Sequence, residues 1–353
     1  MMIPNKWGQG QLFAFSALDG PSYFGDDFTG MLCGDRIGVR FYSKVKRELA
    51  FINVYEKELE FDAVTSDYIC CHFSGLEKMQ IIYAAQHLII GNINGNVLPK
   101  VFTEGLYQTE IVDGAEIHDT QDGDATALKR QGNRFAFAFG HSGDEVVVLV
   151  NKGLAMNLEE AASAKLSFYE KCGAADTLPY ADLYAKCLSV MKTQLYSPEA
   201  KFDTIWSTPD RLPHKSLWLW DSVFHALGHR HIKVSLAEEL IRAVWVHQAD
   251  NGFVPHMANT FESSGITQPP IIAWGTWQIY QTSKNKEFLR CYLRGAFIAN
   301  GSINDPYSRG GYHFEISTLD EEFALYLRKL INEYDIMGPP ALTTQSLLVM
   351  PPQ

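Results

Sequence analysis

Two tryptophans and an aspartate form the most chemically suggestive group in this sequence. Trp218 and Trp220 flank a leucine and lead directly into Asp221, and six of the seven tryptophans lie between residues 206 and 277. Aromatic faces stack on the C–H face of a sugar ring, while short polar side chains bind its hydroxyls. The pattern predicts a sugar-binding surface with Asp221 at its rim. The structural alternative is that Asp221 caps a helix beginning at Ser222.

Two further polar side chains lie on loops punctuated by glycine and proline. His256 belongs to Asn251-Gly-Phe-Val-Pro-His-Met257, and Gln268 belongs to Thr267-Gln-Pro-Pro270, which has the composition of a helix entry. Polar residues on such loops are good candidates for ligand contacts. The alternatives are a structural loop histidine and a glutamine that only ties down its loop.

Few carboxylates in this sequence are good candidates for acid–base catalysis. Inverting glycoside hydrolysis needs two of them with room for a water molecule between. Asp320 is the one late candidate, yet Glu321 and Glu322 follow it, which is also typical of the acidic first turn of a helix. Gly-x-Ser-x-Gly, phosphate-loop and dinucleotide-binding patterns are absent from the sequence.

Three histidines, His225, His229 and His231, invite a metal interpretation, because positions four apart share one helical face. They lack a His-Glu-x-x-His pattern and a third ligand at a matching spacing. We therefore predict no metal and no cofactor. A zinc hydrolase that uses His225 and His229 is the alternative, and it predicts loss of activity with a chelator.

The elements that must position these residues divide the chain into a β part and an α part. Residues 1–175 read as a β-sandwich-like domain, because short β-branched or aromatic runs alternate with turn residues. The strands are expected at 37–42, 49–54, 68–73, 80–83 and 135–139, and a hairpin is predicted to join 135–139 to 146–150 through a Gly-rich turn. Residues 159–171 read as a helix.

Residues 176–353 form the second predicted domain, beginning in the linker 172–179. Apolar residues recur at helical spacing, and the loops between carry Gly, Pro and Asn. Helices are expected at 180–195, 222–230, 236–248, 271–282, 287–293 and 319–334. Helix after helix with functional loops is typical of an α/α toroid.

The charge composition argues against two classes of binding partner. The net charge of -11, without a basic stripe, argues against nucleic acid and against an anionic membrane surface. The N-terminus has no basic and apolar signal regions, and no apolar run reaches membrane-spanning length. The six cysteines have no framework spacing, so we expect reduced thiols in a cytoplasmic protein.

Three motifs, taken together, resemble a known family. Leu217-Trp-Leu-Trp-Asp-Ser-Val-Phe-His-Ala-Leu-Gly228, then Asn251 to Met257, then Thr267-Gln-Pro-Pro-Ile-Ile-Ala-Trp274, are similar in order and spacing to glycoside hydrolase family 63. That group includes processing α-glucosidase, mannosylglycerate and glucosylglycerate hydrolases, and amylo-α-1,6-glucosidase-like proteins. The resemblance covers residues 180–289 closely.

The resemblance implies an (α/α)6 toroid, an inverting mechanism, and α-glucosides, short oligosaccharides or glycosylglycerates as substrates. It implies that Trp218, Trp220 and Asp221 grip the non-reducing sugar, and that His256 and Gln268 line the same cleft. The aspartate acts there as a substrate clamp and not as the proton donor.

The chain departs from the family pattern after Leu289. The general-acid segment is matched only by Asp320, with Ile316, Thr318 and Glu321 where the pattern has other residues, and the general base has no counterpart. Twelve toroid helices do not fit into roughly 175 residues. We therefore predict a glycosidase with a partial toroid, truncated or frame-shifted after Leu289. A catalytically incomplete carbohydrate-binding protein is the alternative, and an oligomer that completes the cleft is left open.

Overall fold

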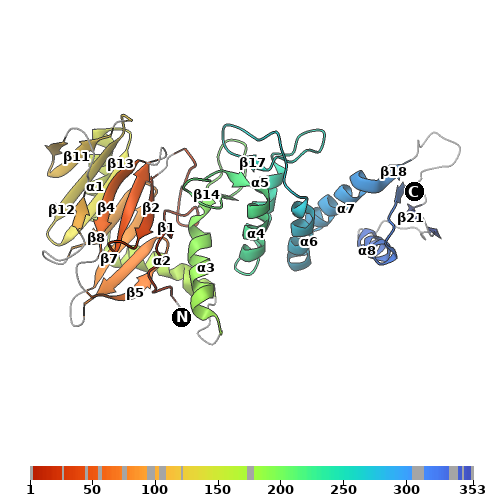
Figure 1. Cartoon of the computed structure of the whole chain (residues 1–353), viewed down its shortest axis with the longest axis horizontal. Helices are drawn as coiled ribbons and strands as arrows, with labels where there is room; N and C mark the ends of the chain where they lie inside the picture. Colours follow the sequence, from red (N-terminus) through yellow and green to blue (C-terminus); the bar gives the residue numbers. More distant parts are fainter. Residues whose placement is uncertain are drawn as a thin grey trace. The chain divides into compact units, whose positions relative to one another are not determined.

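The computed structural model describes residues 3–25, 28–43, 47–54, 58–73, 78–93, 100–102, 109–120, 122–172, 179–303, 314–333, 341–343 and 346–350 (Figure 1). The chain forms two compact units. The first holds Met1–His225 and Arg242–Thr267, and the second holds Ala226–Ile241 and Gln268–Gln353.

Two antiparallel sheets build most of the first unit. The five-stranded sheet has the order β1 (Leu12–Phe13), β2 (Phe28–Cys33), β3 (Gly38–Ser43), β4 (Glu48–Asn53), β9 (Lys100–Phe102). The eight-stranded sheet has the order β10 (Thr109–Val112), β11 (Ala115–Asp119), β12 (Ala125–Gln131), β13 (Arg134–Gly140), β8 (Leu88–Asn92), β7 (Met79–Ala85), β6 (Tyr68–His72), β5 (Glu60–Val64). The strand-rich first part predicted from the sequence is confirmed.

One aromatic core lies between the two sheets. Phe28 and Phe41 of the smaller sheet stack with ring centroids 5.0 Å apart, and Phe28 also meets Phe137 of the larger sheet at 5.7 Å. All three side chains are almost fully buried in a single apolar cluster. Such burial dominates the free energy that holds sheets face to face.

Two helices, α1 (Gly143–Ala155) and α2 (Leu158–Lys171), cover the other face of the eight-stranded sheet. Val146 and Val150 lie one turn apart on α1 and are buried in that contact. Gly153 continues the same face, and a Cβ added there would lie 3.0 Å from the side chains of Ala136 and Ile90. Glycine therefore lets α1 approach the sheet closely.

The predicted hairpin at residues 135–150 is wrong, because β13 is followed by a helix and not by a strand. Ser142 caps α1: its side chain accepts a hydrogen bond from the backbone N–H of Glu145 at 3.2 Å. The carboxylate of Glu145 accepts from the backbone N–H of His141 at 2.8 Å. This Ser-x-x-Glu pattern satisfies otherwise unpaired N–H groups, and it outweighs the strand propensity of the valines that follow.

Replacing Ser142 with alanine should lower the free energy of unfolding by about 1 kcal/mol, because one N–H group at the start of α1 loses its acceptor. Urea denaturation followed by circular dichroism would measure the loss. Ser167→Ala in the body of α2 is the control, since the Ser167 hydroxyl only bonds back to the Ala164 carbonyl at 2.8 Å. Equal losses in the two variants would contradict the capping role.

Helices predominate from residue 181 onward, as predicted. They are α3 (Ala181–Thr193), α4 (Leu219–His229), α5 (Val234–Trp245), α6 (Ile271–Ser283), α7 (Lys286–Asn300) and α8 (Glu321–Asn332). Short strands accompany them: β14 (Leu195–Tyr196), β15 (Trp206–Ser207), β16 (Leu217–Trp218), β17 (Met257–Ala258), β18 (Gly301–Ile303), β19 (Phe314–Ile316), β20 (Ala341–Thr343) and β21 (Ser346–Met350).

The second unit has its own small core. Leu327 and Ile331 of α8 are buried with Ile316, and Leu293 of α7 packs against them. Trp277 of α6 meets Tyr292 of α7 and Tyr326 of α8, with centroid distances of 5.5 and 4.9 Å. Strands β18, β19, β21 and β20 form a four-stranded sheet in that order.

The helical toroid stays a prediction, and so do domains divided at residues 175 and 176. In the described ranges the part of the chain after residue 180 holds six helices, α3 to α8. In the same ranges no helix is both long and apolar enough to cross a lipid bilayer.

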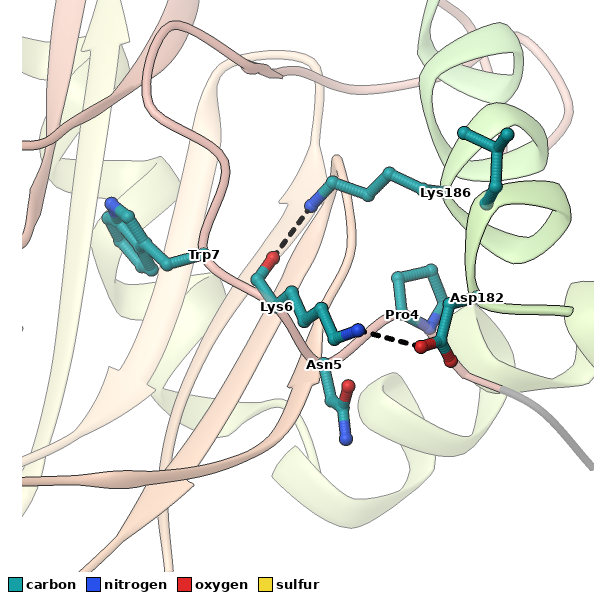
Figure 2. Close-up of a pocket in the computed structure, with 7 residues that line it drawn as sticks. Pro4, Asn5, Lys6, Trp7, Asp182 and Lys186 are labelled. Atoms are coloured by element: carbon teal, nitrogen blue, oxygen red, sulfur yellow. Dashed lines mark hydrogen bonds and ion pairs between the residues drawn. The ribbon is translucent and has the colours of Figure 1, made fainter. Parts of the chain in front are cut away.

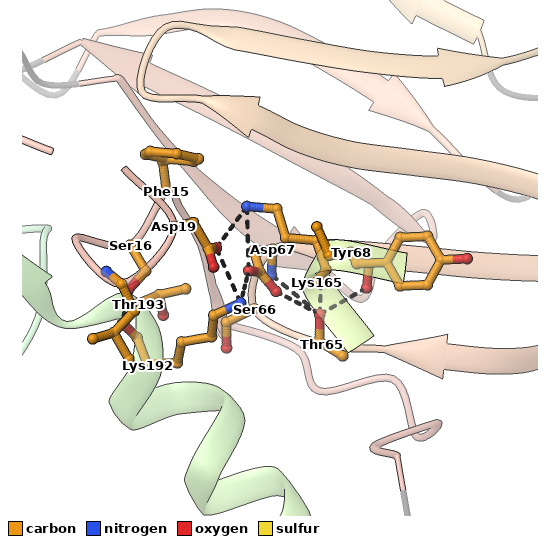
Figure 3. A network of polar contacts seen from close by, with 12 residues as sticks. Phe15, Ser16, Asp19, Thr65, Ser66, Asp67, Tyr68, Lys165, Lys192 and Thr193 are labelled. Atoms are coloured by element: carbon orange, nitrogen blue, oxygen red, sulfur yellow. Dashed lines mark hydrogen bonds and ion pairs between the residues drawn. The ribbon is translucent and has the colours of Figure 1, made fainter. Parts of the chain in front are cut away.

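A cluster of two lysines and two aspartates lies inside the first unit (Figure 3). Lys192 of α3 donates to Asp67 at 2.6 Å and approaches Asp19 at 3.0 Å. Lys165 of α2 lies 2.6 Å from Asp19 and 3.6 Å from Asp67. The side chains of Lys192 and Asp67 are fully buried.

The charges of this cluster compensate one another. The two lysines lower the pKa of Asp67 to about 2, against a burial effect that acts in the opposite direction. Thr65 Oγ1 adds a hydrogen bond to the same carboxylate at 2.9 Å. Because Asp19 and Asp67 lie on loops of the β part while the lysines lie on helices, the cluster joins α2 and α3 to the sheets.

Candidate functional site

A two-stranded ribbon brings two of the sequence motifs together in the first unit. Strand β16 pairs with β17 so that Trp218 lies opposite Met257. The backbone N–H of Leu219 donates to the carbonyl of His256 at 2.9 Å. The tryptophan–aspartate motif and the asparagine–histidine loop, about forty residues apart in the chain, therefore share one small framework.

Trp218 and His256, both predicted site residues, are in direct contact. Their rings meet edge to face with centroids 5.1 Å apart and planes at 74°. His256 Nδ1 lies 2.5 Å from Ser264 Oγ and 3.2 Å from the Ile266 carbonyl, and that hydroxyl itself donates to the carbonyl. Both neighbours therefore accept, so Nδ1 carries the hydrogen, and Nε2 is the nitrogen left with a lone pair.

His214, which sequence reasoning missed together with Asp210, also contacts Trp218. The imidazole of His214 meets the Trp218 ring edge to face at 6.1 Å, and the Trp218 indole N–H donates to the His214 carbonyl at 3.2 Å. Asp210 accepts from His214 Nδ1 at 3.1 Å. The sequence signal was an aspartate and a histidine four positions apart, directly before the aromatic motif.

Asp221 lies in the first turn of α4. The helix begins at Leu219, so Asp221 is its third residue and does not cap a helix that begins at Ser222. Burial raises the pKa of Asp221, although its own backbone amide, the charge of His214 and the indole of Trp220 act in the opposite direction. The carboxylate is thus partly desolvated and polar groups surround it, which suits a ligand that donates hydrogen bonds.

Trp220 differs from Trp218 in its exposure. Its side chain is 43% exposed, whereas Leu219 beside it is buried. Phe224, one turn later on α4, is also exposed. The start of α4 therefore presents aromatic surface next to Asp221.

Lys215 is a third residue whose chemistry sequence reasoning missed. Its ammonium lies 4.3 Å from the centroid of the Phe24 ring and donates to the Phe24 carbonyl at 3.3 Å. Burial lowers the pKa of Lys215 to about 8. The loop before Trp218 is thus held onto the β part of the first unit by a cation–π contact.

Gln268 and Asp320 belong to the second unit. Gln268 lies ahead of α6, whose N-cap residue is Pro270. Asp320 is the N-cap of α8: its Oδ1 accepts from the backbone N–H of Phe323 at 2.9 Å. This is the structural role that the acidic run after Asp320 also predicted.

The histidines of α4 show no metal-binding geometry. Across the described ranges no group of three or more His, Cys, Asp or Glu side chains is arranged to hold a metal ion. Burial lowers the pKa of His225 to about 4, so this imidazole stays neutral at physiological pH.

Two family models match consecutive parts of the chain between residues 213 and 347. Residues 213–297 match the mannosylglycerate hydrolase MGH1-like glycoside hydrolase domain. The segment that carries the candidate site is glycoside-hydrolase-like. Residues 289–347 match the WhiA LAGLIDADG-like domain. We call residues 213–297 the glycosidase-like segment and residues 289–347 the WhiA-like segment; they overlap in α7.

Individual relatives are similar over short stretches. A probable cell division protein WhiA of Exiguobacterium sibiricum is 47% identical over 53 residues, which is 15% of this chain and 16% of that protein. The protein of the same name from Staphylococcus carnosus is 45% identical over 53 residues, 15% of this chain and 17% of that protein. The chain thus spans about a sixth of the length of these relatives.

One solved structure is a weak match. It is a bacterial glucoamylase complexed with acarbose, with a TM-score of 0.42 and 10% sequence identity, over 79% of this chain and 50% of that chain. Similarity at this level carries no argument about the site. The similarity of residues 213–297 to a glycoside hydrolase domain rests on the family model.

The WhiA-like segment contains Asp320. The residue proposed as general acid therefore lies in a part of the chain that is similar to a different family. Trp218, Trp220, Asp221, His256 and Gln268 all lie in the glycosidase-like segment. The catalytic role of Asp320 stays a prediction.

A cavity of about 220 Å³ elsewhere in the first unit is a weaker candidate (Figure 2). It lies between residues 4–7 and α3. Its lining includes Trp7, but that indole donates to the Cys33 carbonyl at 2.8 Å and packs on Phe61 at 5.5 Å. The aromatic face is thus used internally, and the cavity offers no platform for a sugar.

Lys186 lines this cavity, and its Nζ donates to the carbonyls of Lys6 at 2.9 Å and Val64 at 3.4 Å. Burial lowers the pKa of Lys186 to about 8, whereas an unfolded lysine titrates near 10.4. Between these two values the unfolded chain binds more protons. The contribution of Lys186 to stability should therefore rise as the pH increases from about 8 to about 10.

Lys186→Met should remove that dependence. Urea unfolding at pH 7.5 and pH 9.5 would measure it, and the wild type should gain stability relative to the variant at the higher pH. Parallel changes in the two proteins would contradict the lowered pKa.

Proposed function

We propose that this chain binds carbohydrate through the glycosidase-like segment and that Trp218, Asp221 and His256 form the centre of the site. The contact between the Trp218 indole and the His256 imidazole carries the proposal. It combines an aromatic face with a fixed hydrogen-bond acceptor, which is what one pyranose ring requires.

Trp220 and Gln268 are proposed as further sugar contacts. Trp220 is an exposed aromatic side chain beside Asp221. Gln268 is included through the family resemblance of Thr267-Gln-Pro-Pro270. The substrate class is an α-glucoside, a short oligosaccharide or a glycosylglycerate, and its non-reducing sugar is the part bound.

Hydrolysis is the second candidate function, and the match of residues 213–297 to a glycoside hydrolase domain favours it. The mechanism would be a single displacement with inversion, in which one carboxylic acid protonates the leaving oxygen and a carboxylate activates water. Asp320 is the candidate acid, and no residue is assigned as base. In its role as helix cap, Asp320 already accepts a hydrogen bond at one of its carboxylate oxygens. We therefore place binding ahead of hydrolysis.

We also propose a cytoplasmic location. In the described residues no disulfide bond joins any of the six cysteines, Cys33, Cys70, Cys71, Cys172, Cys187 and Cys291. Cysteines without disulfide bonds are the rule in a reducing compartment.

The test is a panel of α-linked glucosides and glycosylglycerates offered to the purified chain. Tryptophan fluorescence reports binding, and NMR follows the anomer released. Release of the β-anomer from an α-linked substrate would establish inverting hydrolysis. Saturable quenching without turnover would support binding alone. Absence of both would refute the proposed function.

A further inference from the structure

Two imidazoles contact the ring of Trp218, and each has its Nδ1 held by a hydrogen bond within the protein. His256 meets the indole at 5.1 Å and 74°, and His214 meets it at 6.1 Å and 77°. In each histidine, Nδ1 is occupied by acceptors of the protein: Ser264 Oγ and the Ile266 carbonyl for His256, and Asp210 for His214. For both side chains, Nε2 is the nitrogen turned away from these bonds.

The orientation of His214 is fixed from several directions. Asp210 accepts from its ring at 3.1 Å and from its backbone N–H at 2.8 Å. Thr208 Oγ1 lies 2.6 Å from the Asp210 carbonyl and 2.9 Å from the His214 carbonyl. The indole of Trp218 donates to that same His214 carbonyl. These hydrogen bonds keep the His214 side chain in one rotamer before a ligand binds. Binding therefore costs less conformational entropy.

The His214 side chain nevertheless remains accessible, with 59% of its surface exposed. Within the described part of the chain its Nε2 forms no hydrogen bond, and His214 also acts electrostatically on Asp221. The His214 imidazole is therefore fixed by the protein at Nδ1 and exposed to solvent elsewhere, and it contacts the Trp218 ring.

We propose that His214, oriented by Asp210, is a specificity-determining residue that binds a hydroxyl of the sugar stacked on Trp218 through its Nε2. This inference rests on the proposed function. A neutral Nε2 accepts a hydrogen bond from a hydroxyl and a protonated one donates to it, so a polyhydroxylated ring can pair with either form. Together, His214 and His256 would bind hydroxyls at two edges of the same platform.

Two substitutions separate this role from a purely structural one. In His214→Gln the amide reaches the position of Nε2 but loses the geometry of the bond to Asp210. In His214→Asn the amide lies where Nδ1 lies, so it keeps the bond to Asp210 but provides nothing at Nε2. Isothermal titration calorimetry with maltose and with glucosylglycerate measures the dissociation constant, and thermal unfolding monitors the fold.

We expect His214→Asn to weaken binding about tenfold and His214→Gln to stay within about threefold of the wild type. The reverse order would show that His214 serves only to hold the loop, and would overturn the inference. Equal affinities in all three proteins would overturn it as well.

The failure of the proposed function is distinguishable from these outcomes. If the wild type binds neither maltose nor glucosylglycerate, both the proposed function and the inference fail. If the wild type binds, Trp218→Ala does not, and His214→Asn binds normally, only the inference fails.

Discussion

Replacing Asp67 with asparagine should lower the free energy of unfolding by about 3–5 kcal/mol, because the substitution leaves an uncompensated cation in the interior. Lys192 loses its 2.6 Å partner and keeps only Asp19 at 3.0 Å, which it shares with Lys165. The asparagine is isosteric and can still accept from Thr65, so the loss reports charge and not shape. Urea unfolding at pH 7 measures it.

An exposed ion pair of similar length provides the control. Lys6 and Asp182 are 2.7 Å apart, with 76% and 56% of their side chains exposed. Asp182→Asn should cost about 1 kcal/mol or less, because water solvates both charges. The double variant Asp67→Asn with Lys192→Met should recover part of the loss, since it removes the excess cation. Equal losses from Asp67→Asn and Asp182→Asn would contradict the account.

The same cluster predicts a pH dependence with a definite sign. The folded pKa of Asp67 lies near 2, below the value of about 4 for an unfolded aspartate. The stability it contributes is therefore fully present above about pH 4 and is lost as the pH falls towards 2. The wild type should lose more stability than Asp67→Asn over this range. Parallel acid titrations would rule out a lowered pKa.

Replacing Asp221 with alanine should weaken sugar binding by about 10- to 100-fold, because a hydrogen bond to a charged group contributes about 1.5–3 kcal/mol. The Asp221 carboxylate lies in the first turn of α4 and is partly buried, and His214 interacts with it electrostatically. Fluorescence titration with maltose or glucosylglycerate measures the effect. If the chain also hydrolyses a substrate, turnover should fall together with binding.

Two further variants sharpen this measurement. Asp221→Asn keeps the shape and removes the charge, so its loss of affinity measures the contribution of the charge. The additional loss in Asp221→Ala measures the contribution of the side chain's shape and neutral hydrogen bonds. Asp250→Ala changes an exposed aspartate of the same unit and should leave binding unchanged. If Asp221→Ala binds the sugar as tightly as the wild type does, Asp221 is not part of the site.

The β part of the fold follows from local sequence patterns, because strands such as β3, β6 and β13 carry runs of aromatic and β-branched residues between turns. The error at α1 is instructive. Five consecutive apolar residues, Val146 to Val150, have strand propensity, but the cap formed by Ser142 and Glu145, three positions apart, sets the helix start. The capping pattern was visible in the sequence, whereas the sheet that buries Val146 and Val150 was not.

Part of the candidate site was predictable from the sequence and part was not. Trp218, Asp221 and His256 follow from motifs, since each lies in a run of distinctive composition. His214 and Asp210 become recognisable as site residues only in the folded loop before Trp218. There Thr208 Oγ1 bonds to the carbonyls of both Asp210 and His214. Short-range folding of this kind leaves no periodic signal for a sequence-based prediction to use.

The end of the family resemblance was also readable from the sequence. It covers residues up to Leu289, and the WhiA-like segment begins at residue 289. What the sequence pattern did not reveal is the identity of the following segment. Asp320 kept one position of the general-acid pattern, and the residues around it matched neither that pattern nor another recognised one. The N-cap geometry of Asp320 shows that an acidic residue before a helix is an ambiguous signal.

The order in which the chain is synthesised gives the buried charge cluster a further significance. Asp19 and Asp67 emerge from the ribosome long before Lys165 and Lys192, at about 5–20 residues per second. Until α3 is complete, the β strands cannot close around these carboxylates without trapping negative charge in the interior. The nascent sheets should therefore remain incompletely packed until residue 192 is available, and a fragment that stops at the last strand of the eight-stranded sheet should not fold by itself.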